Sequence, residues 1–215
     1  MYWYQYMTIG CLATCFLACF WHFFRLIRLG KPKDISQKSG NIAKAEIYSY
    51  TTAMLPNHKE SAYLHIPTFT AGILFHLGVF ISLALFIFFF FADTEIFRQW
   101  LALAIMMFLM LFMLVLGAFS GFLLFLKRMF SNKLRALSTL DDYLSNFLST
   151  LFQLSTGFYL ILGEIFAPYY YITASILLLY LPVGKLRHAV YFFAARYQLG
   201  FFYGWRNSWP PPPKK

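Results

Sequence analysis

The sequence predicts an all-α membrane protein, a five-helix transmembrane bundle with its N-terminus outside and its C-terminus in the cytoplasm. Apolar residues make up 60% of the 215-residue chain and charged residues only 12%, whereas soluble domains average about 25% charged residues. An ordinary water-facing surface cannot be assembled from this composition. Five apolar stretches are long enough to cross a hydrocarbon core, which takes about 20 helical residues. They lie near residues 4–24, 67–91, 100–126, 143–163 and 169–193.

The basic residues determine the predicted orientation. All of the 18 lysines and arginines except Arg98 fall in three segments that share one side of the membrane. The first loop and its flanks hold Arg25, Arg28, Lys31, Lys33, Lys38, Lys44 and Lys59. The loop before the fourth span holds Lys127, Arg128, Lys133 and Arg135. The end of the fifth span and the tail hold Lys185, Arg187, Arg196, Arg206, Lys214 and Lys215. Basic loops remain in the cytoplasm, so the N-terminus is expected outside. This pattern assigns the net charge of +10 to membrane orientation rather than to nucleic acid. The basic first loop either lies along anionic headgroups or docks a cytoplasmic partner.

The remaining organisation is simple. The first apolar stretch has no basic n-region and no small-residue cleavage site, so it is expected to be a retained helix rather than a secretory signal. Residues 1–198 are predicted to form one transmembrane domain that includes a basic cytoplasmic loop at 27–64. Residues 199–215 are predicted to form a Pro-rich cytoplasmic tail.

Three cysteines recur every four residues in the first span and therefore share one helical face. They are Cys11, Cys15 and Cys19. A disulfide or a metal cage needs a different geometry or more ligands. We interpret the cysteines as a small-residue stripe at which another helix packs closely.

Two histidines in the predicted spans are candidate ligands for a haem iron. An ionisable residue inside a membrane span is costly and is therefore a functional candidate. His76 lies about ten residues into the second span, and His188 lies near the cytoplasmic end of the fifth. Neutral imidazoles on two helices can hold a haem iron between them, although an interhelical hydrogen bond explains either histidine taken alone. Gly72 and Gly78 beside His76 are expected to leave space for a flat macrocycle, and Pro182 is expected to bend the fifth helix before His188.

Two further histidines are weaker candidates. His65 precedes His76 by about three helical turns, at nearly the same helical phase and roughly 16 Å away along the axis. It is an alternative ligand or a quinone-site residue. His22, near the inner end of the first span, is a candidate partner for His65 at a second haem, and both histidines are also explained as interfacial residues. His58, among polar residues, is expected to be solvated.

Three segments together resemble the cytochrome b (γ) subunit of respiratory nitrate reductases and its relatives in heterodisulfide-reductase-like and sulfite-reduction-associated membrane complexes. The first is Phe75-His76-Leu77-Gly78-Val79-Phe80 in the second span. The second is the basic stretch from Lys127 through Arg135 to Asp141 and Asp142, followed by Gln153 and Gly157. The third runs from Pro182 to His188. The likeness covers about residues 70–190.

The resemblance implies a haem b bound through His76 and His188. It also implies a second, outer haem, but the positions that would carry that haem's ligands are Phe86 and Tyr170. One haem b is therefore expected, and a second only if it is ligated in another way. The same departure makes the family's outer quinol site doubtful.

By this resemblance the chain is a membrane subunit of a respiratory complex in the prokaryotic inner membrane. It would pass electrons between menaquinone, or another quinone, and a cytoplasmic iron–sulfur subunit. That subunit is required as a partner because the chain has no cysteine cluster for iron–sulfur ligation. Groups considered for quinone proton chemistry are His65, Lys185, Asp141, Asp142 and Glu164.

The sequence bears on two other functions. A haem-free membrane anchor that only tethers a catalytic partner would explain the residues at Phe86 and Tyr170. A small transporter is disfavoured, because the predicted spans contain no carboxylate or basic residue at mid-membrane depth and no repeat of broken helices.

Overall fold

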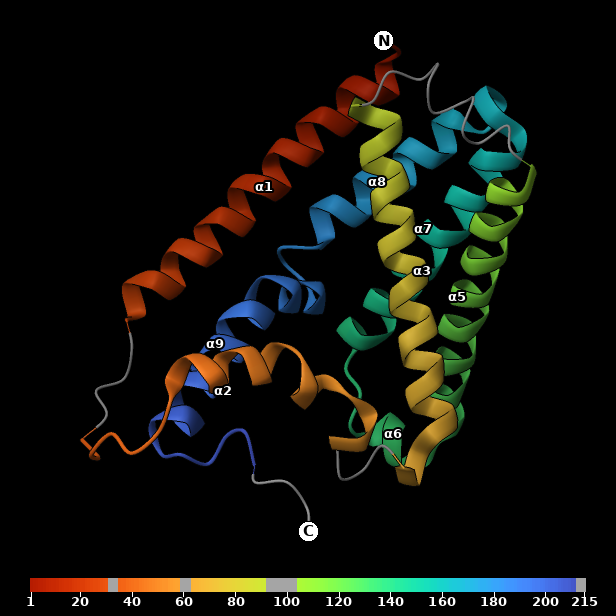
Figure 1. Ribbon diagram of the computed structural model, residues 1–215. Coiled ribbons are helices and arrows are strands. Elements are labelled where there is room, and N and C mark those ends of the chain that lie inside the picture. Colours follow the sequence, from red (N-terminus) through yellow and green to blue (C-terminus); the bar gives the residue numbers. More distant parts are fainter. Residues whose placement is uncertain (31–34, 59–62, 92–103, 212–215) are drawn as a thin grey trace. The chain divides into compact units, whose positions relative to one another are not determined.

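The computed structural model describes residues 1–30, 35–58, 63–91 and 104–211, and every regular element in these ranges is a helix (Figure 1). The α-helices are α1 (Trp3–Leu29), α2 (Ile42–Tyr50), α3 (Ile66–Phe91), α5 (Ala104–Phe130), α6 (Asn132–Ala136), α7 (Leu140–Leu162), α8 (Ala167–Tyr180) and α9 (His188–Trp205). Short 3₁₀ turns are η1 (Thr52–Met54), η2 (Pro56–His58), η3 (Tyr63–His65), η4 (Gly163–Ile165) and η5 (Lys185–Arg187). The predicted all-α class is confirmed for these ranges.

The chain divides into two compact units. The core unit comprises Met1–Cys15 and Pro67–Leu186, and the terminal unit comprises Phe16–Ile66 and Arg187–Lys215. The core unit contains the start of α1 with α3, α5, α6, α7 and α8. The terminal unit contains the rest of α1 with α2 and α9.

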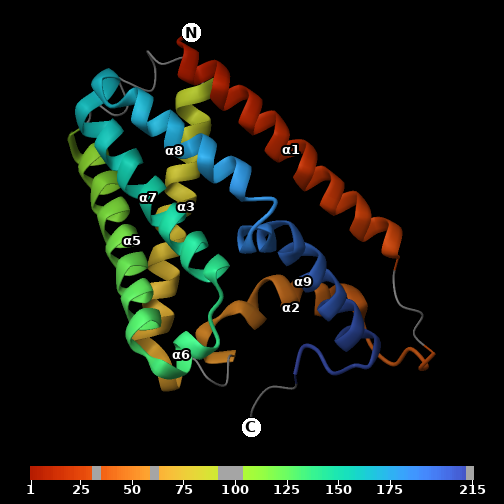
Figure 2. The same cartoon turned by 180° about the vertical axis from the view of Figure 1, so that it is seen from behind.

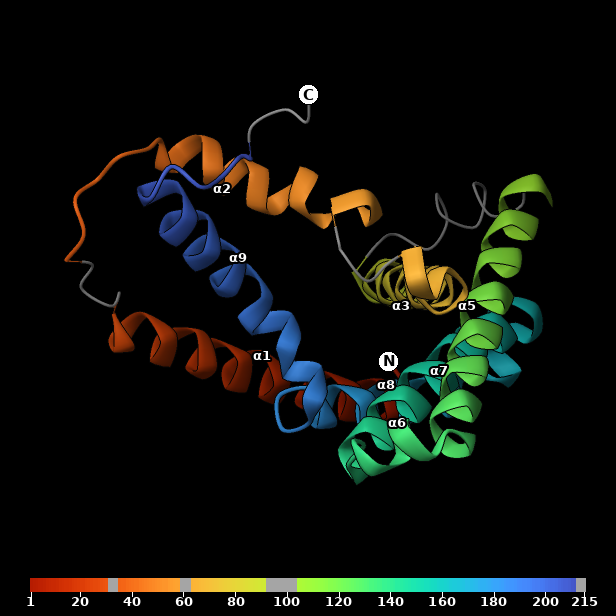
Figure 3. The same ribbon diagram turned by 90° about the horizontal axis from the view of Figure 1, so that it is seen from below.

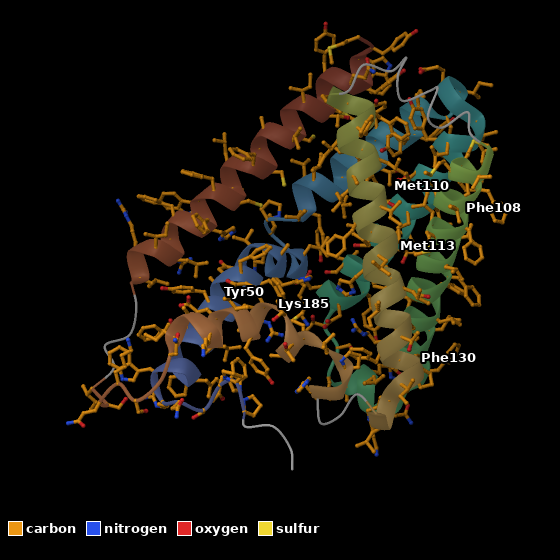
Figure 4. The ribbon with its side chains drawn as sticks, viewed as in Figure 1. Tyr50, Phe108, Met110, Met113, Phe130 and Lys185 are labelled. Carbon is orange, nitrogen blue, oxygen red and sulfur yellow. The ribbon has the colours of Figure 1, made fainter. Side chains whose placement is uncertain are left out.

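Three described helices are long and apolar enough to cross a membrane: Trp3–Leu29, Ile66–Phe90 and Ile105–Phe130. They correspond to the first three predicted spans, although residues 100–103 of the third lie outside the described residues. α8 and α9 together make a fourth candidate if the broken pair is counted as one span. Large apolar side chains of α5 are exposed, including Phe108 (67%) and Phe130 (79%), and Figure 4 shows both projecting from their helix. Such exposure suits a lipid environment and not water.

The fourth predicted span, 143–163, forms α7, but this helix is not among the sufficiently apolar candidates. The polar residues that lower its hydropathy are buried in the core unit: Ser149, Gln153, Ser155 and Thr156. The Thr156 hydroxyl donates to the Phe152 carbonyl at 2.7 Å, as hydroxyls in membrane helices commonly do. α7 runs beside both α5 and α8 (Figure 2). We therefore read α7 as the inner helix of the core unit.

α3 and α5 approach each other at two glycines. A Cβ atom on Gly78 would lie 2.9 Å from the Gly117 Cα, and a Cβ atom on Gly117 would lie 2.8 Å from the Gly78 Cα. The Gln153 side chain of α7 inserts beside both glycines, with its Oε1 buried and without a hydrogen-bond partner in the described part of the chain. Glycine Cα–H groups are weak donors to such an oxygen. Small residues thus bring three helices together, as is common in membranes.

The start of α1 packs on α8 through small polar groups. The Thr8 hydroxyl lies 2.9 Å from the Ser175 hydroxyl and is fully buried. The Tyr4 and Tyr171 rings stack with centroids 5.4 Å apart. Within the core unit, Cys11 is half-buried and Cys15 is buried. None of the three cysteines, all of which lie in described residues, forms a disulfide.

The fifth predicted span, 169–193, is broken after Tyr180. Pro182 has no backbone N–H to continue the helix, and the chain turns with Gly184 N–H donating to the Tyr180 carbonyl at 2.8 Å. The Tyr180 ring lies so close to Gly184 that a Cβ atom there would be 2.3 Å from it. The predicted bend at Pro182 is therefore a break between two helices. α9 then continues to Trp205 and includes the first residues of the predicted tail.

In the terminal unit, α2 packs on α9 (Figure 3). The contact follows Gly200 and Gly204 of α9, which are one turn apart and buried against Glu46 and Ala45 of α2. The Ser49 hydroxyl donates to the Arg196 carbonyl at 2.8 Å. α2 lies in the predicted basic loop 27–64, so part of this loop is folded onto the C-terminal helix. Lys31 and Lys33 of that loop lie outside the described residues.

We predict that Gly200→Ala destabilises the α2–α9 contact. Its Cβ would lie 2.6 Å from the Glu46 Cα, so backbone has to move, and such overpacking costs about 1–3 kcal/mol. The measurement is thermal unfolding of the purified chain in detergent. Gly10→Ala is the matched control, because nothing lies within 4 Å of that position. A Gly200→Ala variant that unfolds at or above the wild-type temperature would contradict the packing described.

Candidate functional site

His76 lies ten residues into α3 and its side chain is exposed. Its Nδ1 lies 2.7 Å from the Gly72 carbonyl oxygen. Because a carbonyl only accepts, Nδ1 carries the hydrogen and the lone pair of the neutral ring is on Nε2. In this tautomer the lone pair that could bind a metal ion is on Nε2.

The two glycines next to His76 have different surroundings. A Cβ atom on Gly72, one turn away on the same face, would meet nothing within 4 Å. Gly78 is about 200° away in helical phase and is filled by Gln153 and Gly117. The expectation that both glycines leave space for a macrocycle is thus wrong for Gly78. Of these two glycines, Gly72 is the one beside which a side chain would meet open space.

The other predicted ligand, His188, is the first residue of α9 and is exposed. It follows η5 directly, and Arg187 precedes it as the N-cap residue. His76 belongs to the core unit and His188 to the terminal unit. The bis-histidine pairing stays a prediction.

His65 is the last residue of η3 and is exposed. The predicted helical phase and distance between His65 and His76 assume one unbroken α-helix. They do not hold, because α3 begins at Ile66 and His65 belongs to the 3₁₀ turn before it. His65 stays a candidate by position alone.

His22 is half-buried in α1 and contacts Tyr191 of α9. Its Nδ1 lies 3.1 Å from the Tyr191 hydroxyl, and the two ring centroids are 5.9 Å apart. No local sequence pattern indicates this pair, because the two residues are 169 positions apart. A second tyrosine–histidine pair joins Tyr48 to His58, with a distance of 3.3 Å between the hydroxyl and Nδ1.

The two positions at which the family would ligate an outer haem contact each other in the core unit. Phe86 and Tyr170 are both buried, with ring centroids 6.3 Å apart. The Tyr170 ring also stacks on Tyr159 at 4.7 Å and on Phe152 at 6.0 Å. Aromatic side chains therefore fill the space between these positions.

Asp142 forms the polar centre of one end of the core unit. Its Oδ1 lies 3.2 Å from Arg128 Nη1 and 2.5 Å from Lys185 Nζ. Its Oδ2 accepts from the Thr139 backbone N–H at 2.9 Å, which completes a capping box at the start of α7. The hydrogen bond from Lys185, the cap and the nearby Arg128 lower the pKa of Asp142 to about 2. Asp142 is thus a permanent anion near neutral pH.

Asp141 is also engaged. Its Oδ1 accepts from the Tyr180 hydroxyl and from the backbone N–H of Lys185 at 3.1 Å. Figure 4 labels Lys185, which follows the break after α8. Asp141 and Asp142 therefore tie the start of α7 to the segment after α8, which makes them structural residues. The Thr139–Asp142 capping box could have been read from the sequence.

Several exposed cations lie near this end. Lys127 at the end of α5 donates to the Thr68 hydroxyl near the start of α3. Lys133, Arg135 and Lys185 are exposed. Two of the predicted basic segments therefore meet at the same end of the core unit.

Glu164, predicted for the other side, is exposed in η4. Asp93, Glu95, Arg98, Lys59, Lys214 and Lys215 lie outside the described residues. No group of three or more histidine, cysteine, aspartate or glutamate side chains that could hold a metal ion occurs in the ranges the structure describes. A haem held by two histidines needs no such group.

Comparison with protein-family models, curated proteins and solved structures finds no match to this chain.

We predict that Asp142→Asn lowers the free energy of unfolding by about 1 kcal/mol at neutral pH, because a partly exposed ion-pair network loses its anion. The pKa of Asp142 is lowered from 3.8 to about 2, so its charge stabilises the fold above pH 4. This contribution is lost as the pH falls toward 2. Unfolding in detergent should therefore show a wild-type advantage that vanishes at low pH, while Glu164→Gln gives no such pattern. An advantage that persists at pH 2 would contradict the ion-pair assignment.

Proposed function

We propose that this chain is the haem b-binding membrane subunit of a respiratory complex. It would pass electrons between menaquinone, or another quinone, and a cytoplasmic iron–sulfur subunit. The observation that carries the proposal is His76: an imidazole on the open face of an apolar helix, with its Nδ1–H held by the Gly72 carbonyl.

An exposed imidazole at this depth is costly in lipid unless something covers it. A carbonyl that accepts from the other ring nitrogen raises the basicity of a ligating histidine and fixes the orientation of its ring. The open space at Gly72 gives a flat ligand access to the same face. A bound haem would supply a one-electron carrier, and His76 would hold and orient it.

His188 is the proposed second ligand, on the resemblance of Pro182 to His188 to the family's segment. His65 is the alternative ligand or a quinone-site residue. We propose one haem, because the aromatic packing of Phe86 and Tyr170 occupies the positions of the outer ligands.

The proposed topology retains five spans with the N-terminus outside and places the chain in the prokaryotic inner membrane. α7 would cross as an inner helix whose polar groups are covered by protein. The cations at the Asp142 end of the core unit would then face the cytoplasm. They suit an acidic docking face on the iron–sulfur partner.

The second candidate function is a haem-free anchor that tethers a catalytic partner. The same aromatic core favours it, since Phe86, Phe152 and Tyr170 pack as a structural core and not as a redox site. Spectroscopy separates the two functions.

We predict that the purified complex shows the Soret and α bands of a low-spin b haem in a reduced-minus-oxidised spectrum. His76→Ala and His188→Ala should each abolish these bands while the protein remains inserted in the membrane. His58→Ala is the matched control, because this exposed histidine is already paired with Tyr48.

The outcomes separate the hypotheses. Bands that disappear in His65→Ala but persist in His76→Ala would show that the ligand assignment is wrong. A wild-type complex without any haem bands would reject the cytochrome function and favour the anchor.

A further inference from the structure

We propose that His22 and Tyr191 form the quinone-binding and proton-transfer site of this subunit. This inference rests on the proposed function, since it names the residues that would serve its quinone. It also replaces the expectation that His22 ligates a second haem.

The geometry suits proton transfer. The His22 Nδ1 and the Tyr191 hydroxyl are 3.1 Å apart, within reach of one hydrogen bond. The rings meet edge to face at 5.9 Å, and both side chains are half-buried. When His22 donates to the tyrosine oxygen, the tyrosine O–H is directed to another acceptor. A quinone carbonyl oxygen is such an acceptor.

The position of the pair also suits a quinone. His22 is seven residues before the end of α1 at Leu29, or about 10 Å along the helix. It lies on an apolar helix that qualifies as a membrane span. Protons can therefore reach it from the helix end that carries Arg25 and Arg28, while a lipid-soluble headgroup reaches it from the membrane.

Most other protonatable groups weighed for this chemistry are engaged in holding the fold. Asp142 is locked as an anion by Arg128 and Lys185. Asp141 accepts from Tyr180 and Lys185. The Tyr48–His58 pair lies on α2 and η2, neither of which is a candidate span. His22–Tyr191 is the tyrosine–histidine pair that joins a candidate span to α9.

The local charge favours a reduced quinone oxygen. Arg25 is one turn from His22 on α1, and Arg187, the N-cap residue of α9, is about one turn from Tyr191. Cations near a site where negative charge develops stabilise that charge. Tyr191 also lies three residues after His188, the proposed haem ligand, in the sequence.

Reduction of the quinone to the quinol takes two electrons and two protons, and the electrons come from the reduced iron–sulfur partner. The quinone oxygen that accepts from Tyr191 gains its hydrogen as the Tyr191 O–H bond breaks, and the other quinone oxygen takes the second proton from water. The tyrosine oxygen then takes the Nδ1 hydrogen of His22, and His22 recovers a proton from cytoplasmic water. Quinol oxidation is the reverse.

The test is photoaffinity labelling of the full chain in lipid nanodiscs with an azidoquinone, mapped by peptide mass spectrometry. We expect labelled peptides from α1 around His22 and from α9 around Tyr191. Tyr191→Phe should weaken quinone binding about three- to tenfold, which is the effect of one lost hydrogen bond. Tyr48→Phe is the matched control and should bind quinone as the wild type does.

His22→Gln separates binding from proton transfer. Glutamine can donate to Tyr191 but cannot be titrated, so binding should persist while quinone turnover of the complex falls about a hundredfold or more. Labelling confined to other helices, or binding unchanged by Tyr191→Phe, overturns the site. Absence of haem bands from the wild type overturns the proposed function instead. The two outcomes are distinct, because quinone labelling of the chain is measured whether or not haem is bound.

Discussion

The close approach of α3 and α5 at Gly78 and Gly117 determines which groups of the core unit are available for chemistry. Two opposed glycines let the backbones meet, and Gln153 of α7 fills the remaining space. One face of α3 is thereby committed to packing. The opposite face, with Gly72 and His76, is left without a close neighbour at Gly72 and with an exposed imidazole. Bare polar groups are costly in lipid, and this exposed imidazole is therefore the basis of the proposed ligand site.

The polar end of the core unit follows a different rule. Asp142 combines a helix cap with two cations, and Asp141 binds the segment after α8. The break at Pro182 would leave backbone groups unpaired, and Asp141 accepts from one of them, the Lys185 N–H. Two carboxylates that could serve proton chemistry, Asp141 and Asp142, are thus used to hold a broken helix. In the proposed function, proton transfer is assigned to histidine and tyrosine side chains.

The sequence was sufficient for the features that depend on composition and local pattern. The helical class, the first three candidate spans, and a departure from a straight helix near Pro182 follow from apolar length and from the missing N–H of proline. The full break between α8 and α9 was not predicted. The sequence was insufficient where the outcome depends on which face a helix packs. The packing of Gly78, the fold of α2 onto α9, and the His22–Tyr191 pair all join residues far apart in the chain. α7 shows the same limit, since hydropathy alone cannot tell a polar helix covered by protein from one exposed to water.

The aromatic core bears on how many haems the subunit can hold. Phe86, Tyr170, Phe152 and Tyr159 make a continuous set of ring contacts at centroid distances of 4.7–6.3 Å. To make room for a macrocycle, these buried rings would have to separate, and each loses the stabilisation of its apolar burial and of its ring pairs. Without histidine at either position, no iron ligand offsets that loss. These rings are therefore expected to serve as a scaffold of the core unit and not to hold a haem.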